Sequence, residues 1–489
     1  MFRDYVIKTL AAKYENWIII FDFDNIESRY RYTALLSDMG FQIIVYNDAT
    51  EFRLIYETEI KTSKEKYAIL VKSENYVPYD ILKKFYCVSI SLDILFPNLN
   101  KDYLINHNSI ELPLLYTAYE NLYKDLTHFE ETSSYVIKEV YGKNNVEIYI
   151  EDIKVEIMEL VSSNDLNYDS WISIASKKGK AEYLAAKVGI TVDFSFIDEA
   201  FKNFILNGYT TISSIIHRDS PVMVSRVMDF IYKKNAKVAL IVLDGMSVFD
   251  FNVIASEFNG IEYQEGFIYA MVPTTTAISR PSLLSGKFPV ELEKPFNLSR
   301  EEKEFRSKAK SLGYLEKQIS YERGYNPDIG PNVKCISIII NDIDDLVHGQ
   351  LQGKVGMYND VKFLAKSRKV QHLIYRLHEE GFNVYLTSDH GNTLCQGTGI
   401  VKGTGVEVET KSKRMLILKN FADSKDLIKK YNLVEYPGYY LDKQYLYLIC
   451  NTGKSFDNKN SMVMTHGGIS IDEVIVPFIK VKEVKPWLR

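Results

Sequence analysis

The sequence predicts a protein of the α/β class, in which a C-terminal domain with a mostly parallel sheet flanked by helices follows a small α/β domain and a helical region. Short apolar runs alternate with amphipathic segments over residues 17–97, and again from residue 237 to the C-terminus. This alternation is typical of parallel strands joined by helices. Between these parts, residues 112–234 have few glycines and mostly helical apolar spacing.

A chain of 489 residues is too long for one typical core, and ordinary domain sizes favour about three domains. The changes in pattern place a small α/β domain at residues 1–110, a helical region at 111–235 and a larger α/β domain at 236–489. We expect the boundary before the last domain near Asn235.

In the first domain we expect strands at 17–21, 41–46, 67–71 and 88–95, and helices at 28–39 and 52–60. The first strand ends in the acidic pair Asp22 and Asp24. These carboxylates either hold a magnesium ion or a nucleotide ribose, or cap the strand and begin a turn. Capping is favoured because no partner ligands are visible.

The helical region contains periodic segments at 151–161, 171–175, 181–188 and 197–206. In the last domain the expected strands are 237–243, 336–340, 384–387, 415–418 and 474–479, and the expected helices are 278–285, 300–311, 361–381 and 424–431. The charged stretch 290–322 predicts a solvated insertion rather than a substrate lid. The glycine-rich stretch 397–413 predicts a flexible loop beside the site.

The composition is that of an ordinary globular protein, with 46% hydrophobic and 25% charged residues. A net charge of -5 gives no sign of a protein coated in nucleic acid, although a local basic groove stays compatible with it. The cysteines lie far apart with no C-x-x-C spacing, which indicates reduced side chains. With no signal peptide or apolar span in the sequence, we expect a cytoplasmic protein without membrane contact.

Carboxylates follow three of the expected strands of the last domain. Asp244 follows 237–243, Asp389 follows 384–387, and Asp344 comes a few residues after 336–340. The carboxyl ends of parallel strands gather at one edge of a sheet, where ligands bind. We therefore expect these carboxylates to converge on a metal-bearing crevice.

Histidines complete two candidate ligand sets. Asp344 and His348 are four residues apart, which puts both side chains on one face of a helix. With His466 they make one set of three, and Asp244, Asp389 and His390 make the other. Two divalent metals about 4 Å apart activate a nucleophile and neutralise charge in phosphate ester hydrolysis. Asp342 and Asp345 flank Asp344 and are alternatives to it as ligands.

A hydroxyl stands at the start of an expected helix. Thr276 follows a Pro-Thr-Thr turn and opens the helix, so its oxygen lies at a helix N-terminus that favours anions.

The order of these segments resembles the alkaline phosphatase superfamily, and within it the PglZ-domain proteins. That branch is found in bacterial phage-defence systems of the BREX type and in some signalling proteins. The resemblance covers about residues 236–478. It is carried by Asp244-Gly, Pro-Thr-Thr-Thr276 ending in Leu-Leu-Ser-Gly286, Asp344 with His348, Ser-Asp389-His390-Gly and Thr-His466-Gly-Gly.

The resemblance implies roles for these residues. Asp244, Asp389 and His390 match the ligands of the metal that also contacts the nucleophile, and Asp344, His348 and His466 match the ligands of the other metal. Thr276, ten residues before Gly286, matches the nucleophile and so is itself a metal contact. Arg280 matches an arginine that contacts the transferred group, since a guanidinium fits a phosphoryl group.

The implied activity is that of a metal-dependent phosphodiesterase or phosphatase. A sulfatase of this superfamily needs Cys or Ser as nucleophile, and the methyl group of Thr276 disfavours that activity. A threonine alkoxide suits phosphoryl transfer through a covalent intermediate. The implied cofactors are two divalent ions, zinc first, with Mn or Mg as alternatives. Thr274 and Thr275 remain rivals of Thr276 as nucleophile.

Other functions stay open. The chain could be a non-catalytic scaffold, or a nucleic-acid or partner-binding module of a defence complex. It could also be a phosphomutase, which requires a pocket rich in arginines. The candidate partners are a phosphate-ester substrate, including a nucleotide or nucleic acid, and proteins of a defence system. The arginines available for such a pocket are Arg280, Arg300, Arg306, Arg323, Arg368, Arg376 and Arg414.

Overall fold

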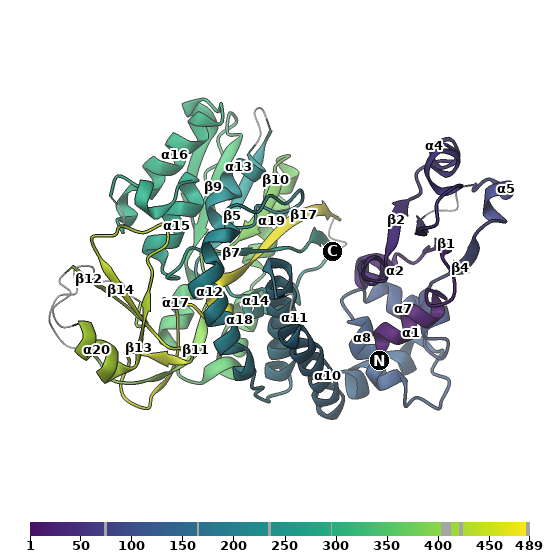
Figure 1. Cartoon of the computed structure of the whole chain (residues 1–489), viewed down its shortest axis with the longest axis horizontal. Helices are drawn as coiled ribbons and strands as arrows, with labels where there is room; N and C mark the ends of the chain where they lie inside the picture. Colours follow the sequence, from purple (N-terminus) through teal and green to yellow (C-terminus); the bar gives the residue numbers. More distant parts are fainter. Residues whose placement is uncertain are drawn as a thin grey trace. The chain divides into compact units, whose positions relative to one another are not determined.

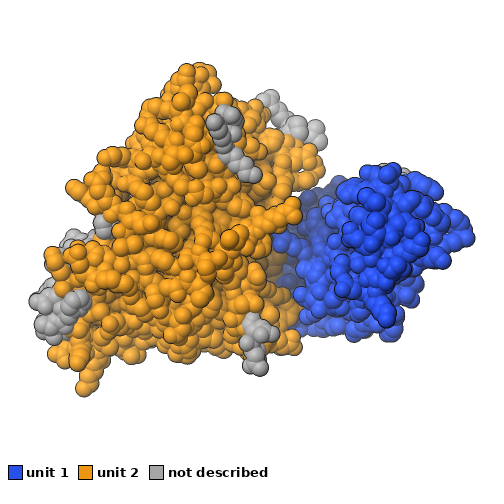
Figure 2. Space-filling model, turned by 45° about the horizontal axis from the view of Figure 1, so that its top comes forward, with its two compact units in different colours: residues 1–152 blue, residues 153–489 orange. Residues whose placement is uncertain are grey.

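We analysed a computed structural model of the chain, which describes residues 1–72, 76–163, 166–232, 236–294, 296–401, 412–419 and 424–485. The chain divides into two compact units, residues 1–152 and 153–489 (Figure 2). The division expected from sequence, into regions 1–110, 111–235 and 236–489, stays a prediction, and its expected boundary at Asn235 lies outside the described residues.

Unit 1 contains a parallel sheet with strand order β2-β3-β1-β4. Its strands are β1 (Trp17–Phe21), β2 (Phe41–Val45), β3 (Lys66–Val71) and β4 (Tyr86–Ser89). The central strand β1 pairs in parallel with β3 and with β4, and its residues Ile18, Ile19 and Ile20 are fully buried. A strand buried on both faces needs helices on each side, which explains the continuous apolar run.

The helices of unit 1 are mostly short. They are α1 (Phe2–Thr9), α2 (Ile26–Arg29), α3 (Tyr32–Asp38), α4 (Ala49–Ile55) with a π-helical turn (Tyr56–Ile60), α5 (Tyr79–Leu82), α6 (Leu92–Leu95), α7 (Lys101–Asn106), α8 (Leu112–Tyr119) and α9 (Phe129–Tyr135) with a second π-helical turn (Val136–Val140). Helix α10 (Lys143–Ser162) contains residues of both units.

Two expected elements of unit 1 differ from the structure. The expected strand at 88–95 is the end of β4 followed by helix α6. The expected helix at 28–39 is interrupted between α2 and α3, where Tyr30 has extended backbone angles. An apolar run shorter than two helical turns does not distinguish strand from helix, because both bury it.

Unit 2 begins with helices alone, and from residue 238 strands alternate with single helices or with runs of helices (Figure 1). The helices are α11 (Tyr168–Lys187), α12 (Asp198–Ile212), α13 (Val227–Ile231), α14 (Val248–Ala255), α15 (Thr276–Ser285), α16 (Glu301–Ser311), α17 (Asp342–Gly349), α18 (Gly353–Lys366), α19 (Lys369–Glu379), α20 (Ser424–Tyr431) and α21 (Ile471–Val474). No helix in the described ranges is both long and apolar enough to cross a membrane.

The main sheet of unit 2 has strand order β6-β17-β10-β5-β9-β8, and β7 also pairs with β17. Strands β8, β9, β5 and β10 are parallel, whereas β17 runs antiparallel to β10, β6 and β7. The strands are β5 (Val238–Leu243), β6 (Ile261–Gln264), β7 (Phe267–Tyr269), β8 (Ile319–Arg323), β9 (Cys335–Ile340), β10 (Asn383–Thr387) and β17 (Ile475–Val484). The predicted α/β class with a mostly parallel sheet is confirmed.

Smaller sheets follow the parallel core in sequence. One has order β15-β11-β16 and another has order β12-β14-β13. Their strands are β11 (Thr393–Gly397), β12 (Met415–Leu418), β13 (Leu433–Tyr436), β14 (Leu446–Cys450), β15 (Lys454–Ser455) and β16 (Met462–Thr465). Strand β11 directly follows the segment that carries Asp389 and His390, so this small sheet anchors one end of that segment.

The core of unit 2 lies along the centre of the main sheet. Every residue of β5 and of β9 is buried. Alternate residues of β5, among them Ile241 and Leu243, belong to one apolar cluster with Phe249 of α14 and Leu373 of α19. This arrangement fixes the positions at which the parallel strands end, and the loops at those ends carry the candidate site.

The structure corrects two expectations for unit 2. The stretch 290–322 is not a separate solvated insertion, because β8 pairs with β9 and the α16 residues Phe305 and Ala309 are fully buried. Their spacing of four puts them on one helix face within a charged sequence. The expected helix at 361–381 is broken at Arg368, whose φ is 59°. The expected loop at 397–413 falls largely on residues 402–411, outside the described residues.

Candidate metal centre

The strand ends bring the predicted carboxylates to one edge of the main sheet. Asp244 directly follows β5, and its amide donates to the carbonyl of Ile340 at the end of β9 over 2.9 Å. Gly245 then turns the chain with a φ of 75°. A Cβ on Gly245 would lie 3.5 Å from the Cα of Asp344, so the turn after β5 lies close against the start of α17.

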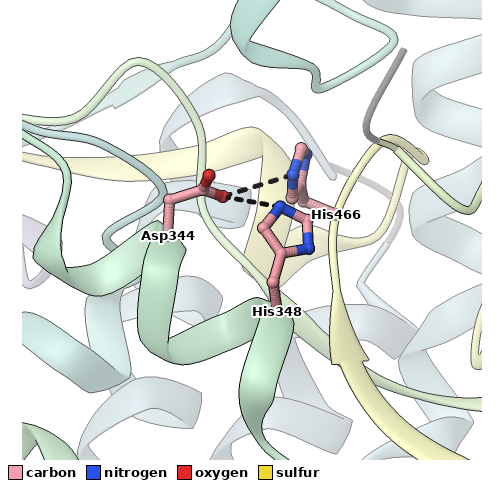
Figure 3. Close-up of side chains that lie close together, drawn as sticks. All are labelled: Asp344, His348 and His466. Atoms are coloured by element: carbon pink, nitrogen blue, oxygen red, sulfur yellow. Dashed lines mark ion pairs between the residues drawn. The ribbon is translucent and has the colours of Figure 1, made fainter. Parts of the chain in front are cut away.

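The first cluster consists of Asp344, His348 and His466 (Figure 3). Asp344 and His348 lie one helical turn apart on α17, as expected, and Asp344 Oδ1 is 3.4 Å from His348 Nε2. His466 follows β16, and its Nε2 lies 3.3 Å from the same oxygen. These three atoms are buried without a hydrogen-bond partner among the described residues. Three lone-pair donors that converge in this way are the arrangement that binds a metal cation.

The charge of Asp344 dominates this first cluster. Burial alone would raise the pKa of Asp344, but His348 and His466 outweigh it and hold that pKa below its usual range. Burial would lower the pKa of His466, but the same carboxylate raises it above the ordinary value. The carboxylate is therefore charged at neutral pH, as a metal ligand must be.

The second cluster consists of Asp244, Asp389 and His390, all buried. His390 Nε2 lies 3.7 Å from Asp244 Oδ1 and 3.9 Å from Asp389 Oδ2. Asp389 Oδ1 accepts from the amides of Gly245 and His390. Its Oδ2 has no hydrogen-bond partner in the described part of the chain. One oxygen of Asp389 is thus fixed by the backbone and the other is free to ligate.

Burial and like charge make the second cluster costly when no cation balances it. Burial first, and then the charge of Asp244, raise the pKa of Asp389 well above its usual value. Burial first, and then the ring of His466, lower the pKa of His390 to about 4. Buried carboxylates that repel each other, next to a neutral imidazole, favour a bound divalent cation.

Backbone carbonyls orient two of the histidines. His390 Nδ1 lies 3.0 Å from the carbonyl oxygen of Gly391, and His466 Nδ1 lies 3.1 Å from that of Thr274. A carbonyl accepts only from a protonated nitrogen, so each Nδ1 carries the proton and each Nε2 presents its lone pair to its cluster.

The two clusters are direct neighbours. The rings of His390 and His466, one from each cluster, stack with centroids 4.2 Å apart and planes 18° apart. All six predicted ligands, and no other described residues, make up the two His, Cys, Asp or Glu groups whose geometry suits a metal ion. The other histidines weighed from sequence, His217, His372 and His378, belong to neither group.

Thr276 lies at the second cluster. It is the first residue of α15, and its Oγ1 is 3.4 Å from Asp244 Oδ1 and 3.0 Å from His390 Nε2. The rival hydroxyls lie elsewhere. Thr274 Oγ1 donates to the carbonyl of Gly468 over 2.9 Å, and the buried hydroxyl of Thr275 has no hydrogen-bond partner among the described residues.

Arg280 is buried one helical turn after Thr276 and forms ion pairs on two sides. Its Nη1 donates to Asp244 Oδ2, and its Nε donates to Glu301 Oε2 over 2.8 Å. Glu301, on α16, also accepts from Tyr321 and Arg323. The structure therefore places Arg280 against a candidate metal ligand. Its contact with a transferred group stays a prediction.

Some residues of the site were not predicted. Glu301 and Glu473 are fully or nearly buried and contact the segments that carry the candidate ligands. The sequence contains one signal for Glu473, since Ser470 and Glu473 have capping-box spacing and form that box at the start of α21. Glu301 carries no such signal, because its role depends on a contact with Arg280, 21 positions away.

Comparison with known families decides the classification. The family model of the BREX system PglZ alkaline phosphatase-like domain matches residues 222–481, which is more than half of the chain. The chain belongs to the PglZ family. This confirms the resemblance inferred from the segment order, and the PglZ domain contains both candidate clusters and Thr276. A search of curated proteins finds no match.

Solved structures similar to the chain cover about half of it. Murine ectonucleotide pyrophosphatase / phosphodiesterase 5 is 12% identical, with a TM-score of 0.32, over 50% of this chain and 87% of that chain. The human protein of the same name is 14% identical, with a TM-score of 0.31, over 50% of this chain and 87% of that chain. Phosphonoacetate hydrolase from Sinorhizobium meliloti 1021, in complex with phosphonoacetate, is 9% identical, with a TM-score of 0.35, over 53% and 94%.

Proposed function

We propose that the chain is a two-metal phosphoric ester hydrolase, a phosphodiesterase or phosphatase, with Thr276 as its nucleophile. The observation that carries the proposal is the position of Thr276 Oγ1, 3.0 Å from His390 Nε2 and 3.4 Å from Asp244 Oδ1. A hydroxyl at this place would contact a cation held by Asp244, Asp389 and His390. The first cluster, Asp344, His348 and His466, would hold the other cation beside it, because the rings of His390 and His466 stack.

The ligand types support zinc as the first candidate, with Mn or Mg as alternatives. Each cluster offers both imidazole nitrogens and carboxylate oxygens, a mixture that suits zinc better than magnesium. When bound, a divalent metal would lower the pKa of the Thr276 hydroxyl and neutralise charge on the phosphoryl oxygens.

In the proposed reaction, Thr276 Oγ gives up its proton to water and attacks the phosphorus atom. The bond from phosphorus to the leaving oxygen breaks, and the leaving group takes up a proton from water. A water molecule then attacks the phosphorus of the covalent adduct, the bond to Thr276 Oγ breaks and the hydroxyl is restored, with phosphate released from a monoester substrate or a phosphate monoester from a diester substrate. The N-terminus of α15 directs backbone amides toward the anionic group. Arg280 would hold Asp244 in place by its ion pair and is available to the transferred group if that pair loosens.

Thr276→Ala tests the nucleophile. We expect turnover of a generic phosphate mono- or diester to fall by about 10³-fold or more, while metal content stays within about twofold of wild type because six ligands remain. Thr275→Ala is the matched control, since Thr275 is the adjacent residue and its hydroxyl lies in neither cluster. Acid quenching followed by mass spectrometry should find a covalent adduct on Thr276 in the wild type, phosphate from a monoester or a phosphate monoester group from a diester. Turnover that survives in Thr276→Ala would sink the assignment.

The family assignment supports a role in phage defence, because the matching model describes a domain of the BREX system. In that role the substrate would be a phosphate ester, with nucleotides and nucleic acids as candidates, and defence proteins would be the partners. A scaffold without catalysis is the main alternative. It predicts no turnover of any ester under conditions in which metals are bound.

The arrangement of the arginines does not favour a phosphomutase. Six of the seven arginines considered from sequence form ion pairs with carboxylates: Arg280, Arg300, Arg306, Arg323, Arg376 and Arg414. Arg280 and Arg414 are buried in those pairs. A phosphosugar pocket needs several guanidinium groups directed at one open space, whereas these are directed at carboxylates, with Arg280 and Arg323 sharing Glu301.

A further inference from the structure

One buried carboxylate contacts the three segments that carry Thr276, His390 and His466. Glu473 lies in the short helix α21, between β16 and β17, and is fully buried. None of the metal clusters includes it. Its hydrogen bonds nonetheless reach each of these three segments within two residues of the proposed functional side chain.

The contacts of Glu473 are made by both its side chain and its backbone. Its Oε1 accepts from the amide of Gly468 over 2.9 Å and from the hydroxyl of Thr274 over 3.4 Å. Its backbone carbonyl accepts from the amide of Gly391 over 2.9 Å. Gly468 is two residues after His466, Thr274 is two before Thr276, and Gly391 follows His390.

Thr274 connects two of these segments to each other as well. Its hydroxyl donates to the carbonyl of Gly468 over 2.9 Å and accepts from the amide of Gly467 over 3.3 Å. Its carbonyl is the acceptor for Nδ1 of His466. The distance between His466 of the first cluster and Thr276 of the second is therefore set through hydrogen bonds that end on Glu473.

Arg414 supplies the positive charge that balances the buried carboxylate of Glu473. The Arg414 side chain is fully buried, and its Nη1 donates to Glu473 Oε2. Its Nε and Nη2 donate to the carbonyls of Lys454 and Asn451 over 3.0 and 3.2 Å. Every branch of the guanidinium is thus held. A paired and fully hydrogen-bonded ion pair is rigid, whereas loss of one partner leaves an uncompensated buried charge.

The surrounding backbone leaves little space for other arrangements. A Cβ on Gly391 would lie 1.9 Å from the carbonyl oxygen of Asp472, and one on Gly468 would lie 2.6 Å from Cζ of Arg414. Both glycines therefore let the functional segments pack directly against α21 and Arg414. Close packing of this kind transmits a displacement of Glu473 to His390 and His466.

We propose that Glu473, neutralised by Arg414, is a positioning residue that sets the spacing between the two metal clusters and the nucleophile. The inference rests on the proposed function, in that it assumes both clusters bind metal. Glu473 would contact neither metal nor substrate, but it holds the three segments that carry Thr276, His390 and His466. Partners of metal ligands act in this way, and their loss typically weakens metal binding by about 10–100-fold.

Glu473→Gln is the direct test, read by zinc titration of the full chain against a competing chelator. Glutamine keeps the size and one acceptor oxygen, but its amide group would face the donors of Ser470 and Arg414. We expect the zinc dissociation constant of at least one site to rise by about 10-fold or more. In the metal-free protein we also expect faster amide hydrogen exchange at Gly391 and Gly468.

Glu182→Gln is the matched control. Glu182 is also buried, at 8% exposure, and forms ion pairs with Lys178 and Lys354, but within the described ranges it has no hydrogen bond to the three segments. The Glu182→Gln variant should lose thermal stability in the same way as Glu473→Gln. Its zinc affinity should stay within about twofold of wild type, because the hydrogen bonds that hold the three segments are unchanged. Equal weakening of zinc binding in both variants would overturn the inference, since it would reflect general destabilisation.

Thr274→Val replaces Glu473→Gln as the test variant if the latter does not fold. Valine has the shape of threonine and removes only the hydroxyl that links Gly467, Gly468 and Glu473, so the same rise in the zinc dissociation constant is expected. Wild type that binds zinc at both sites, with unchanged affinity in the folded test variant, overturns this inference alone. Wild type that binds none of zinc, Mn and Mg overturns the proposed function and this inference together.

Discussion

Buried ionic side chains are concentrated around the candidate site. Arg280 and Arg414 lie in ion pairs within unit 2, and Lys178 pairs with both Glu182 and Asp472 at 2.5 and 2.6 Å. Removal of one partner from such a pair is strongly destabilising, by about 3–5 kcal/mol, because a charge stays buried without compensation. The stability of this unit should therefore depend on pH through residues that are not ligands.

Asp198, the first residue of α12, gives a testable case of this dependence. Burial first, opposed by Lys178, raises the pKa of Asp198 to about 6. Because the folded state holds the proton more tightly than the unfolded state, stability falls as pH rises from about 4 to about 6. The free energy of unfolding of Asp198→Asn should thus exceed that of wild type by about 1–2 kcal/mol at pH 8, a value reduced because Asp198 is partly exposed. At pH 4 the two proteins should be equally stable.

Denaturant unfolding at both pH values measures this difference. Asp193→Asn is a control of opposite sign, because hydrogen bonds from Ser195 lower the pKa of Asp193. That variant should be less stable than wild type near neutral pH, and the deficit should shrink as pH falls below the ordinary carboxyl range. A gain in Asp198→Asn that is the same at pH 4 and pH 8 would contradict the assigned pKa.

The candidate ligands could be predicted from sequence because local rules place them. Asp244 and Asp389 follow short apolar runs that alternate with helical segments, which predicts strands, and the spacing of Asp344 and His348 fits one helix face. Glu473 and Arg414 could not be predicted in their roles. The two residues lie 59 positions apart along the chain, and no local pattern specifies which buried cation meets which buried carboxylate.

At the scale of elements, α11 packs closely against α14, the helix that follows Asp244. A Cβ on Gly179 of α11 would lie 2.5 Å from Cγ1 and 2.9 Å from Cβ of Val248. Only glycine permits this approach, so the distance between the two helices is set at one position. The helical segments expected at 171–175 and 181–188 are two parts of the single helix α11. They did not predict its partner, since periodicity indicates a buried face without naming what covers it.

Gly179→Ala tests the close approach. The added methyl group must displace Val248, so we expect the free energy of unfolding to fall by about 1–3 kcal/mol. Gly208→Ala in α12 is the matched control, because its nearest neighbour would be the ring of Phe204 at 3.4 Å. That variant should gain about 0.5–1 kcal/mol from helix propensity. Chemical denaturation compares the two, and equal effects would contradict the packing argument.

At the scale of the whole molecule, the chain consists of two compact units, and the candidate site lies within residues 153–489. Unit 1 has its own parallel sheet and core. Its acidic pair is used structurally: Asp22 accepts from the amides of Ile26 and Glu27, and Asp24 accepts from the amide of Leu92. This is the capping role that the sequence favoured over a metal site.

The α/β class and the general alternation of strands and helices in the PglZ domain could be predicted because apolar periodicity reports burial directly. Strands β6, β7 and β8 were not predicted. The small sheets after β10 were predicted only in part. Of the strands in the sheet of order β12-β14-β13, the sequence indicated β12, whereas β13 and β14 pair with each other in an antiparallel register. Short antiparallel strands gain much of their stability from cross-strand contacts, which a single segment does not reveal.

Anomalous scattering from crystals soaked in zinc tests the central claim most directly. We predict two peaks per chain. One should lie among Asp244, Asp389, His390 and the Thr276 oxygen, and the other among Asp344, His348 and His466, separated by about 4 Å as in two-metal sites. A single peak, or peaks away from these side chains, would contradict the account of a two-metal phosphoric ester hydrolase.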